Sequence, residues 1–182
     1  IDAMVELPSG DEIRVIGVHP RPPEPIRDND ATARDAELVI WGKELAEDDR
    51  PIVIGGDLND VAWSPSTRLF LRLSQLLDPR RGRGFFNSFH ADHVWMRFPL
   101  DHVFHSTHFG VRDLQRLGHV GSDHFPILID LQLQPVLKQE QEPLEEKASD
   151  EEEAEEKLQR AVESEEIGMS SMQLSTRTPA IG

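Results

Sequence analysis

Three short polar clusters along the chain contain the residue types that hydrolysis of a phosphate ester needs. Asp57 and Asn59 end one apolar run, Asp101 begins a second, and Asp123 and His124 precede a third. A carboxylate can take a proton from water, and an amide can hold that water or a phosphate oxygen. An imidazolium can stabilise the charge that develops on phosphate. If the three clusters meet in space, they favour a phosphate ester hydrolase.

Two of these aspartates also have ordinary structural explanations. Asp57 follows two glycines, where an aspartate often caps a turn, and Ser-Asp before a strand, as at Asp123, is a common turn as well. In the functional interpretation, Asp123 would bind Mg²⁺, which needs only one or two carboxylates because it keeps several waters. The sequence alone leaves both interpretations open.

Asp101 lies among apolar residues, and an ionisable group in such a place usually has a partner. If the partner is His124, the carboxylate would fix the tautomer of the imidazole and favour its protonated form. Alternatively, Asp101 forms a structural ion pair with an arginine such as Arg97 or Arg112. The sequence does not separate these alternatives.

Two further groups of residues invite a functional interpretation. The run Arg-Arg-Gly-Arg-Gly at 80–84 is either a loop that receives a phosphate or a solvated turn. Five of the eight histidines fall close together in the sequence, but their spacing matches no zinc-binding pattern, so we reject a zinc site. These five are His90, His93, His102, His105 and His108.

The apolar patterns predict strands and helices that would position these residues. Ser64 before Pro65 predicts the start of a helix, and the four prolines at 20–25 predict a loop with His19 at its mouth. The unbroken apolar run before Gly55 is typical of a strand covered on both faces. The predicted strands span 1–7, 12–19, 51–55, 100–105 and 125–133, and the predicted helices span 31–47 and about 65–77.

Composition divides the chain near Pro135. Residues 1–134 are expected to form the globular part, and residues 135–182 an acidic, largely disordered tail with a helix at about 149–167. The net charge of −15 is distributed as −7 (21 acidic against 14 basic residues) and −8 (13 against 5). Such acidity disfavours electrostatic binding of long nucleic acid unless bound cations reverse the charge locally. Cysteine is absent, which excludes disulfides and thiolate metal sites.

Taken together and in this order, the motifs resemble those of a known family. Gly-Asp-Leu-Asn at 56–59, Leu-Asp-His-Val-Phe at 100–104 and Gly-Ser-Asp-His-Phe-Pro at 121–126 are similar to the last three motifs of the endonuclease/exonuclease/phosphatase family of metal-dependent phosphoesterases. His19, at the end of a strand, is similar to the family's histidine in the strand before the first of these motifs. The resemblance covers about residues 1–133.

The resemblance implies a fold and a cofactor. The fold would be α/β (α+β), as part of a four-layer αββα sandwich with the site at the strand ends between two sheets. The cofactor would be Mg²⁺ or Mn²⁺, which Asp123 would help to bind. The substrate would be a phosphate ester, either nucleic acid or a small phosphorylated molecule.

The resemblance also implies roles for the other site residues. Asp57 would activate or position the attacking water, and Asn59 would orient that water and the phosphate. His124 would contact the scissile phosphate with Asp101 behind it, and His19 would lie near the phosphate or the leaving oxygen.

The chain departs from the family pattern at its beginning. Family members carry an asparagine and a metal-binding glutamate at the ends of strands upstream of the histidine strand, and the chain begins after the place for both. We therefore expect a piece of a longer protein, in which the upstream part of the same domain is a partner and the N-terminal strands are missing here. The chain resembles bacterial members with a Gly-Arg-Gly loop before the Leu-Asp-His motif, and some of these carry membrane helices upstream. The resemblance therefore allows a bacterial, membrane-tethered parent, while this fragment itself is expected to be soluble, without direct membrane contact.

Two hypotheses for function follow. The first is a divalent-metal-dependent phosphoesterase that hydrolyses a phosphodiester or a phosphomonoester, nucleases included, present here as a truncated domain. The alternative is a non-catalytic binding module of the same fold, whose acidic tail engages a basic partner.

Overall fold

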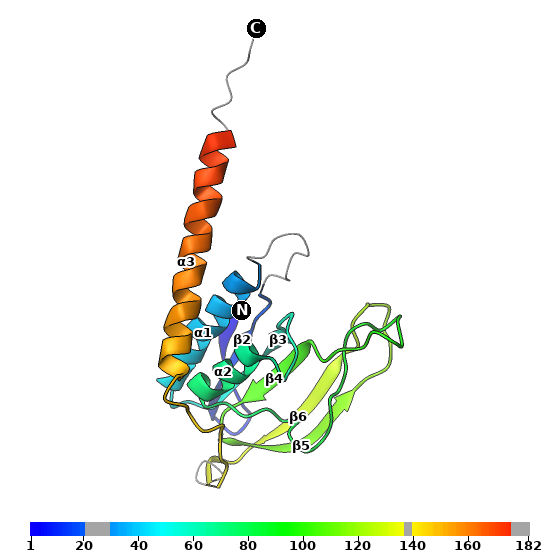
Figure 1. Cartoon of the computed structure of the whole chain (residues 1–182). Coiled ribbons are helices and arrows are strands. Elements are labelled where there is room, and N and C mark those ends of the chain that lie inside the picture. Colours follow the sequence, from blue (N-terminus) through cyan, green and yellow to red (C-terminus); the bar gives the residue numbers. More distant parts are fainter. Residues whose placement is uncertain (21–29, 137–139, 176–182) are drawn as a thin grey trace.

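The computed structural model describes residues 1–20, 30–136 and 140–175, and in the last range it describes side chains as far as residue 164 (Figure 1). Most of the predicted proline-rich loop at 20–25 lies outside these ranges. The elements in chain order are β1 (Asp2–Glu6), β2 (Glu12–Gly17), α1 (Asp30–Ala46), β3 (Ile52–Asp57), α2 (Pro65–Ser74), β4 (Asp101–His105), β5 (Phe109–Arg116), β6 (Ile127–Leu133) and α3 (Asp150–Ser175).

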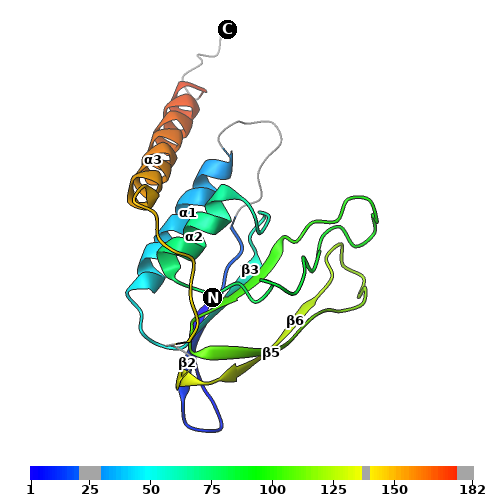
Figure 2. The ribbon, with the colours of Figure 1, turned by 60° about the horizontal axis from the view of Figure 1, so that its bottom comes forward.

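The strands form two sheets. One sheet has the order β1-β2-β3-β4, in which β2 and β3 are parallel and the other two pairs are antiparallel, and the second is the antiparallel pair β5-β6. The parallel pair requires a crossover, and α1 provides it. Helices α1 and α2 cover one side of the larger sheet, while β5 and β6 lie on its other side (Figures 1 and 2). The predicted α/β class, an α+β sandwich, is confirmed.

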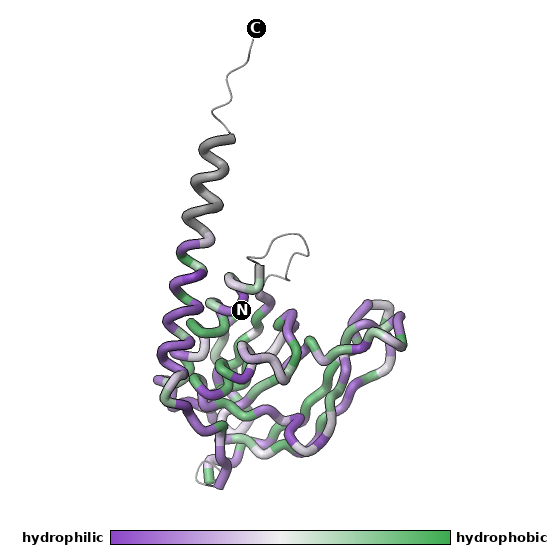
Figure 3. The backbone as a smooth tube through the Cα atoms, viewed as in Figure 1, coloured by the Kyte–Doolittle hydropathy of each residue, from purple (hydrophilic) through white to green (hydrophobic). Residues whose placement is uncertain are grey.

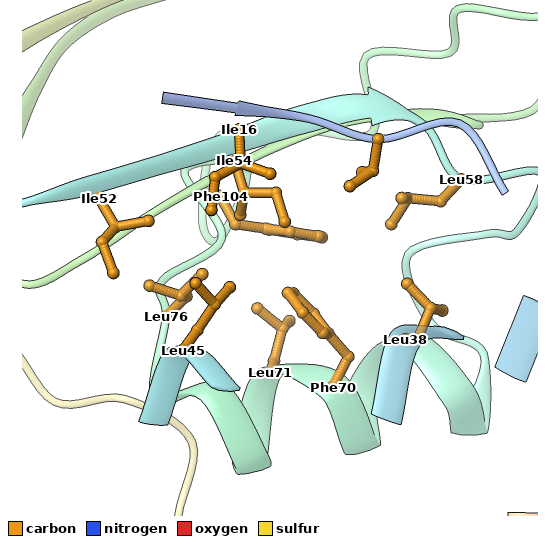
Figure 4. Close-up of a cluster of buried hydrophobic side chains, with 11 residues drawn as sticks. Ile16, Leu38, Leu45, Ile52, Ile54, Leu58, Phe70, Leu71, Leu76 and Phe104 are labelled. Atoms are coloured by element: carbon orange, nitrogen blue, oxygen red, sulfur yellow. The ribbon is translucent and has the colours of Figure 1, made fainter. Parts of the chain in front are cut away.

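The main core lies between the larger sheet and the two helices (Figure 4). Ile16, Ile54 and Phe104 extend from three neighbouring strands toward Leu45 and Phe70 of the helices, and all five are at most 2% exposed. The rings of Phe70 and Phe104 are 5.5 Å apart between centroids. Burial of such side chains stabilises the fold by about 1.5–3 kcal/mol each. By packing β3 and β4 against the two helices, this core positions the ends of these strands.

Helix α2 starts as its sequence predicts. The Ser64 hydroxyl accepts a hydrogen bond from the Thr67 backbone N–H, and Pro65 occupies the first helical position. The helix ends at Ser74 because Gln75 adopts a left-handed conformation with φ +56°. The predicted continuation to residue 77 was therefore wrong, although Leu76 remains part of the core beyond the helix.

Strand β5 was not predicted. Its sequence is rich in polar residues, and a register irregularity between Val111 and Asp113 interrupts the alternation of inward and outward side chains. Strand β5 is stabilised by its backbone hydrogen bonds to β6, and its own sequence pattern does not predict this pairing. Residues 127–133 do alternate between half-buried and exposed side chains, as expected for a strand with one covered face.

Helix α3 is longer than the expected helix at about 149–167, and its first turns pack against α1 and α2. Ala154 is fully buried there with Val39 and Leu69. Figure 3 shows that most residues in the coloured part of α3 are hydrophilic, with only a few hydrophobic ones among them. The expectation of a largely disordered tail therefore needs correction for 150–164, where tertiary contacts stabilise a helix that would be marginal alone. In the described part of the chain, no helix has an apolar stretch long enough to cross a membrane.

Ion pairs hold α3 in place. The Arg72 Nε lies 2.8 Å from the Asp150 carboxylate, and both side chains are less than a tenth exposed. The Lys157 ammonium lies 2.8 Å from Asp35 of α1, and Lys43 pairs with Glu151. The acidic start of α3 thus neutralises basic side chains of the domain itself.

Asp150→Ala is expected to lower the free energy of unfolding by about 3–5 kcal/mol, because it leaves the Arg72 guanidinium buried without its main partner. Urea unfolding followed by circular dichroism measures this change. Glu155→Ala, at an exposed position of the same helix, is the matched control and should change stability by less than about 0.5 kcal/mol. Equal stability of the two variants would contradict the docked position of α3.

Candidate active site

The ends of β3 and β4 bring two carboxylates face to face. Asp57 and Asp101 are directly opposed in the antiparallel register of these strands. Gly56 makes this approach possible, because its φ is +153° and a Cβ there would lie 1.8 Å from the Val18 carbonyl oxygen. A side chain at this position would push β2 away from β3. The glycine before Asp57 therefore belongs to the architecture of the site.

His124 is the partner of Asp101. Its Nδ1 lies 2.7 Å from the Asp101 Oδ2, and its Nε2 lies 3.8 Å from the Asp57 Oδ2. The Phe89 ring packs against the imidazole with centroids 4.8 Å apart. The geometry thus favours the histidine over an arginine as the partner of Asp101, and it directs the Nε2 edge toward Asp57.

His19 and Asn59 complete the cluster around Asp57. The His19 Nε2 lies 3.8 Å from the Asp57 Oδ2, and the Asn59 backbone N–H donates a 2.8 Å hydrogen bond to the Asp57 Oδ1. The Asn59 side-chain amide donates to the Pro20 carbonyl oxygen at 3.0 Å. Asp57 therefore caps a turn and also faces two imidazoles, so the two interpretations of this residue are compatible.

Asp123 belongs to the turn that immediately precedes His124. Its side chain is exposed, and its described contact is with the Ser122 hydroxyl at 3.4 Å. Its backbone carbonyl accepts a hydrogen bond from the Ala91 N–H, which fixes the turn before His124. The structure thus brings together five of the six predicted site residues, while among the described residues no hydrogen bond or ion pair joins the exposed Asp123 side chain to those five.

The environment shifts the pKa values of the two central groups. Burial raises the pKa of Asp57, and the charge of Asp101 adds to this, while the Asn59 N–H and the two imidazoles act in the opposite direction. Burial lowers the pKa of His124, but the hydrogen bond to Asp101 and the charges of Asp101 and Asp57 outweigh it, so this pKa lies above its ordinary value. A carboxylate with a raised pKa beside a readily protonated imidazole suits proton transfer.

The described residues do not by themselves fit the metal ion that the resemblance implies. Within 1–20, 31–136 and 140–164, no three histidine or acidic side chains converge as metal ligands. Asp57 and Asp123 both offer the hard oxygen ligands that Mg²⁺ prefers, and the Asp123 side chain is exposed. The remaining ligands of such an ion would be water molecules, phosphate oxygens or side chains outside the described residues.

Sequence reasoning missed several residues that support the site. The Ser88 hydroxyl accepts hydrogen bonds from the Leu100 and Asp101 N–H groups at 3.2 and 3.0 Å, and so fixes the start of β4. Phe89 was missed as well, because its contact with His124 joins residues that are far apart in the sequence.

Several residues of the basic run at 80–84 and of the histidine group make contacts within the fold itself. Arg80 is buried and forms two hydrogen bonds with Asp78, so this member of the run is not a free phosphate ligand. His102 and His105 are buried in β4, whereas the rings of His90 and His93 contact each other at a tilt of 57°, with centroids 4.4 Å apart. These histidines thus occupy different environments.

Comparisons with known proteins agree with this geometry. The family model described as "Endonuclease/Exonuclease/phosphatase family" matches residues 2–124. Similar solved structures include an endonuclease/exonuclease/phosphatase from Beutenbergia cavernae DSM 12333 (22% identity, TM-score 0.56, 73% of this chain and 39% of that one). They also include the mannosyl-6-phosphatase of Bacteroides thetaiotaomicron VPI-5482 (24%, 0.50, 69% and 53%) and humanized D. rerio TDP2 (14%, 0.58, 72% and 59%).

These likenesses in structure show the fold, and the chain spans about half the length of the structures that it matches. A comparison with curated proteins gave no match. Members of the matched family hydrolyse phosphate esters and generally depend on divalent metal ions. By the family match over residues 2–124, and by the fold that it shares with these structures, the chain belongs to the endonuclease/exonuclease/phosphatase family.

Proposed function

We propose that this chain carries a large part of the active site of a divalent-metal-dependent phosphoesterase, which hydrolyses a phosphodiester or a phosphomonoester. The observation that carries the proposal is the line from Asp101 through His124 to Asp57, with separations of 2.7 and 3.8 Å. These three residues come from separate segments of the chain and meet at the ends of two strands. Family membership adds the reaction class.

The side chains divide the chemistry between them. The raised pKa of Asp57 makes its carboxylate a better acceptor for the proton of the attacking water, and Asn59 orients that water and the phosphate. His124, protonated and held by Asp101, stabilises the charge that develops on a phosphoryl oxygen. A separation of 3.8 Å is too long for a direct hydrogen bond, so the Nε2 edges of His19 and His124 can turn toward substrate oxygens.

The metal ion would supply charge neutralisation at the phosphate when bound. Asp123 would be one of its ligands, and the others would come from a longer protein that contains this chain. The support for a longer protein is the share of the matched structures that the chain spans, between 39% and 59% in the three described above. In this proposal residues 1–134 form the C-terminal part of the family domain, onto which α3 packs.

The proposal predicts metal-dependent hydrolysis by the full-length protein. Activity toward bis-p-nitrophenyl phosphate, a diester, and p-nitrophenyl phosphate, a monoester, should fall to background with EDTA. It should return when Mg²⁺ or Mn²⁺ is added in excess, because the chelated ion is then replaced. Hydrolysis that persists in EDTA would contradict the metal dependence, and no hydrolysis of either ester with metal present would contradict the enzyme assignment for these substrate classes.

The charges of α3 bear on the alternative, a binding module with an acidic tail. Asp150 and Glu151 are paired with Arg72 and Lys43 of the domain itself. The start of the tail therefore offers less free negative charge to a basic partner than its composition suggests. This observation favours the enzyme over the module.

A further inference from the structure

The loop that follows β3 holds Asn59 in an unusual conformation. The φ of Asn59 is +49°, in the left-handed region that few residues other than glycine adopt, although asparagine does so more readily than most. At the start of this bend, the Asn59 N–H donates a hydrogen bond to the Asp57 Oδ1. The backbone at Asn59 thus sets the orientation of the central carboxylate as well as that of its own amide.

Two buried side chains hold the two successive carbonyl groups that follow this bend. The Arg34 Nη1 of α1 donates to the Asn59 carbonyl oxygen at 2.8 Å. The His102 Nε2 of β4 lies 2.8 Å from the Asp60 carbonyl oxygen. The carbonyl groups of two successive residues in this loop are therefore held by two different elements, one by helix α1 and the other by strand β4.

The surroundings of His102 fix which nitrogen carries the proton. The Arg80 Nη2 lies 2.7 Å from the His102 Nδ1. Because a guanidinium can only donate, Nδ1 must accept, and the proton of the neutral ring must be on Nε2. That N–H then donates to the Asp60 carbonyl. Burial, together with the charge of Arg80, lowers the pKa of His102 to about 4, so the ring stays neutral at physiological pH.

Each of these side chains is itself held in place. The Asp78 carboxylate accepts hydrogen bonds from the Arg80 Nε and Nη2 at 2.9 and 2.8 Å, and both side chains are less than a tenth exposed. The Arg34 guanidinium is held in the same way by Asp35, with its Nη2 2.9 Å from the carboxylate. Neither group can swing away without breaking a buried ion pair.

We propose that His102 and Arg34 are positioning residues, which hold Asn59 in its left-handed conformation through the two adjacent carbonyls and thereby orient Asp57. Neither touches the space between Asp57 and His124, and each acts only through the backbone. The consequence for rate rests on the proposed function, whereas the consequence for the loop does not. A displacement of about 1 Å in such a site can reduce the rate about 100-fold.

The test compares two replacements of His102 in the full-length protein. His102→Leu removes the donor to the Asp60 carbonyl, while His102→Gln keeps an N–H group near the position of Nε2. We expect kcat of His102→Leu to be about 10- to 100-fold below that of the wild type, with KM changed less than about threefold. The kcat of His102→Gln should be much closer to the wild-type value. Arg34→Met should lower kcat similarly, and the double variant by less than the product of the two effects.

His105→Leu is the matched control, because His105 is equally buried in the same strand and bonds to the Ser106 carbonyl instead of the loop. It should lower the melting temperature without lowering kcat. If His102→Leu, His102→Gln and His105→Leu lower kcat and the melting temperature in parallel, His102 is only structural and the proposal is overturned.

A measurement without substrate keeps the proposal testable if a variant is unstable or if the protein has no activity. Nitrogen-15 spectra of the wild-type histidines should show His102 neutral with its proton on Nε2, and the opposite tautomer would refute the proposal. Amide hydrogen exchange at Asn59 should be at least about tenfold faster in His102→Leu than in the wild type, in His102→Gln or in His105→Leu, because only His102→Leu lacks the donor to the Asp60 carbonyl. An unchanged exchange rate at Asn59 in a folded His102→Leu variant would overturn the proposal. An inactive wild type that shows the expected tautomer and exchange rates would refute only the proposed function.

Discussion

Asp57→Asn is expected to lower kcat/KM for phosphate ester hydrolysis by about 10²- to 10⁴-fold. The amide keeps the shape of the side chain and can still accept the Asn59 N–H, but it cannot take a proton from water. Initial rates over a range of substrate concentrations measure the effect. Asp130→Asn, an exposed change on the distant strand β6, should leave the rate unchanged.

The same variant should not lose stability. The folded protein binds a proton at Asp57 more tightly than the unfolded chain does, since the pKa of Asp57 is raised in the fold, first of all by burial. The ionised carboxylate therefore opposes folding at neutral pH, and replacing it by a neutral amide should leave the free energy of unfolding equal or higher. A variant that retains wild-type activity would remove Asp57 from the proposed mechanism, and one that is inactive because it unfolds would contradict the stability argument.

Asp101→Asn is expected to lower kcat/KM by about 10²-fold or more, because it removes the charge that holds His124 in its orientation and favours its protonated form. In the wild type the pKa of His124 is raised despite burial, and Asp101 is the main cause of the increase. Without that charge, burial lowers the pKa, and the imidazolium is lost at a lower pH. The alkaline side of the rate profile should therefore move to lower pH in the variant.

Proton NMR titration of His124 in the two proteins measures this shift directly. The raised pKa also means that the protonated imidazole stabilises the wild type. This contribution is fully present below the pKa of an unfolded histidine and is lost as the pH rises through the higher pKa of the folded state. The wild type should thus be more stable than Asp101→Asn at acidic pH, and the difference should diminish at alkaline pH. The same pKa for His124 in both proteins would rule out Asp101 as its electrostatic partner.

Local patterns in the sequence were sufficient for several parts of the fold. The Ser64-Pro65 start of α2 depends on one hydroxyl and the N–H three residues later, so it can be read from the sequence. The same holds for the hairpin of β1 and β2 and for the unbroken apolar run of β3. Strand β5 could not be read in this way, since its stability depends on pairing with β6 and its alternation is interrupted at Asp113.

The sequence by itself determined which residue types stand at the ends of which strands, and in which order, and this was enough to indicate the family. Only the tertiary structure decided that Asp101 pairs with His124, 23 residues away, and that Arg72 pairs with Asp150, 78 residues away. Helix starts and strand alternation depend on neighbours along the backbone, which the sequence lists directly. Which side chains become partners depends on distances across the fold, which the sequence does not list. For the same reason, only the tertiary structure showed that His102, whose sequence surroundings have no distinguishing pattern, bonds to the loop that follows Asp57.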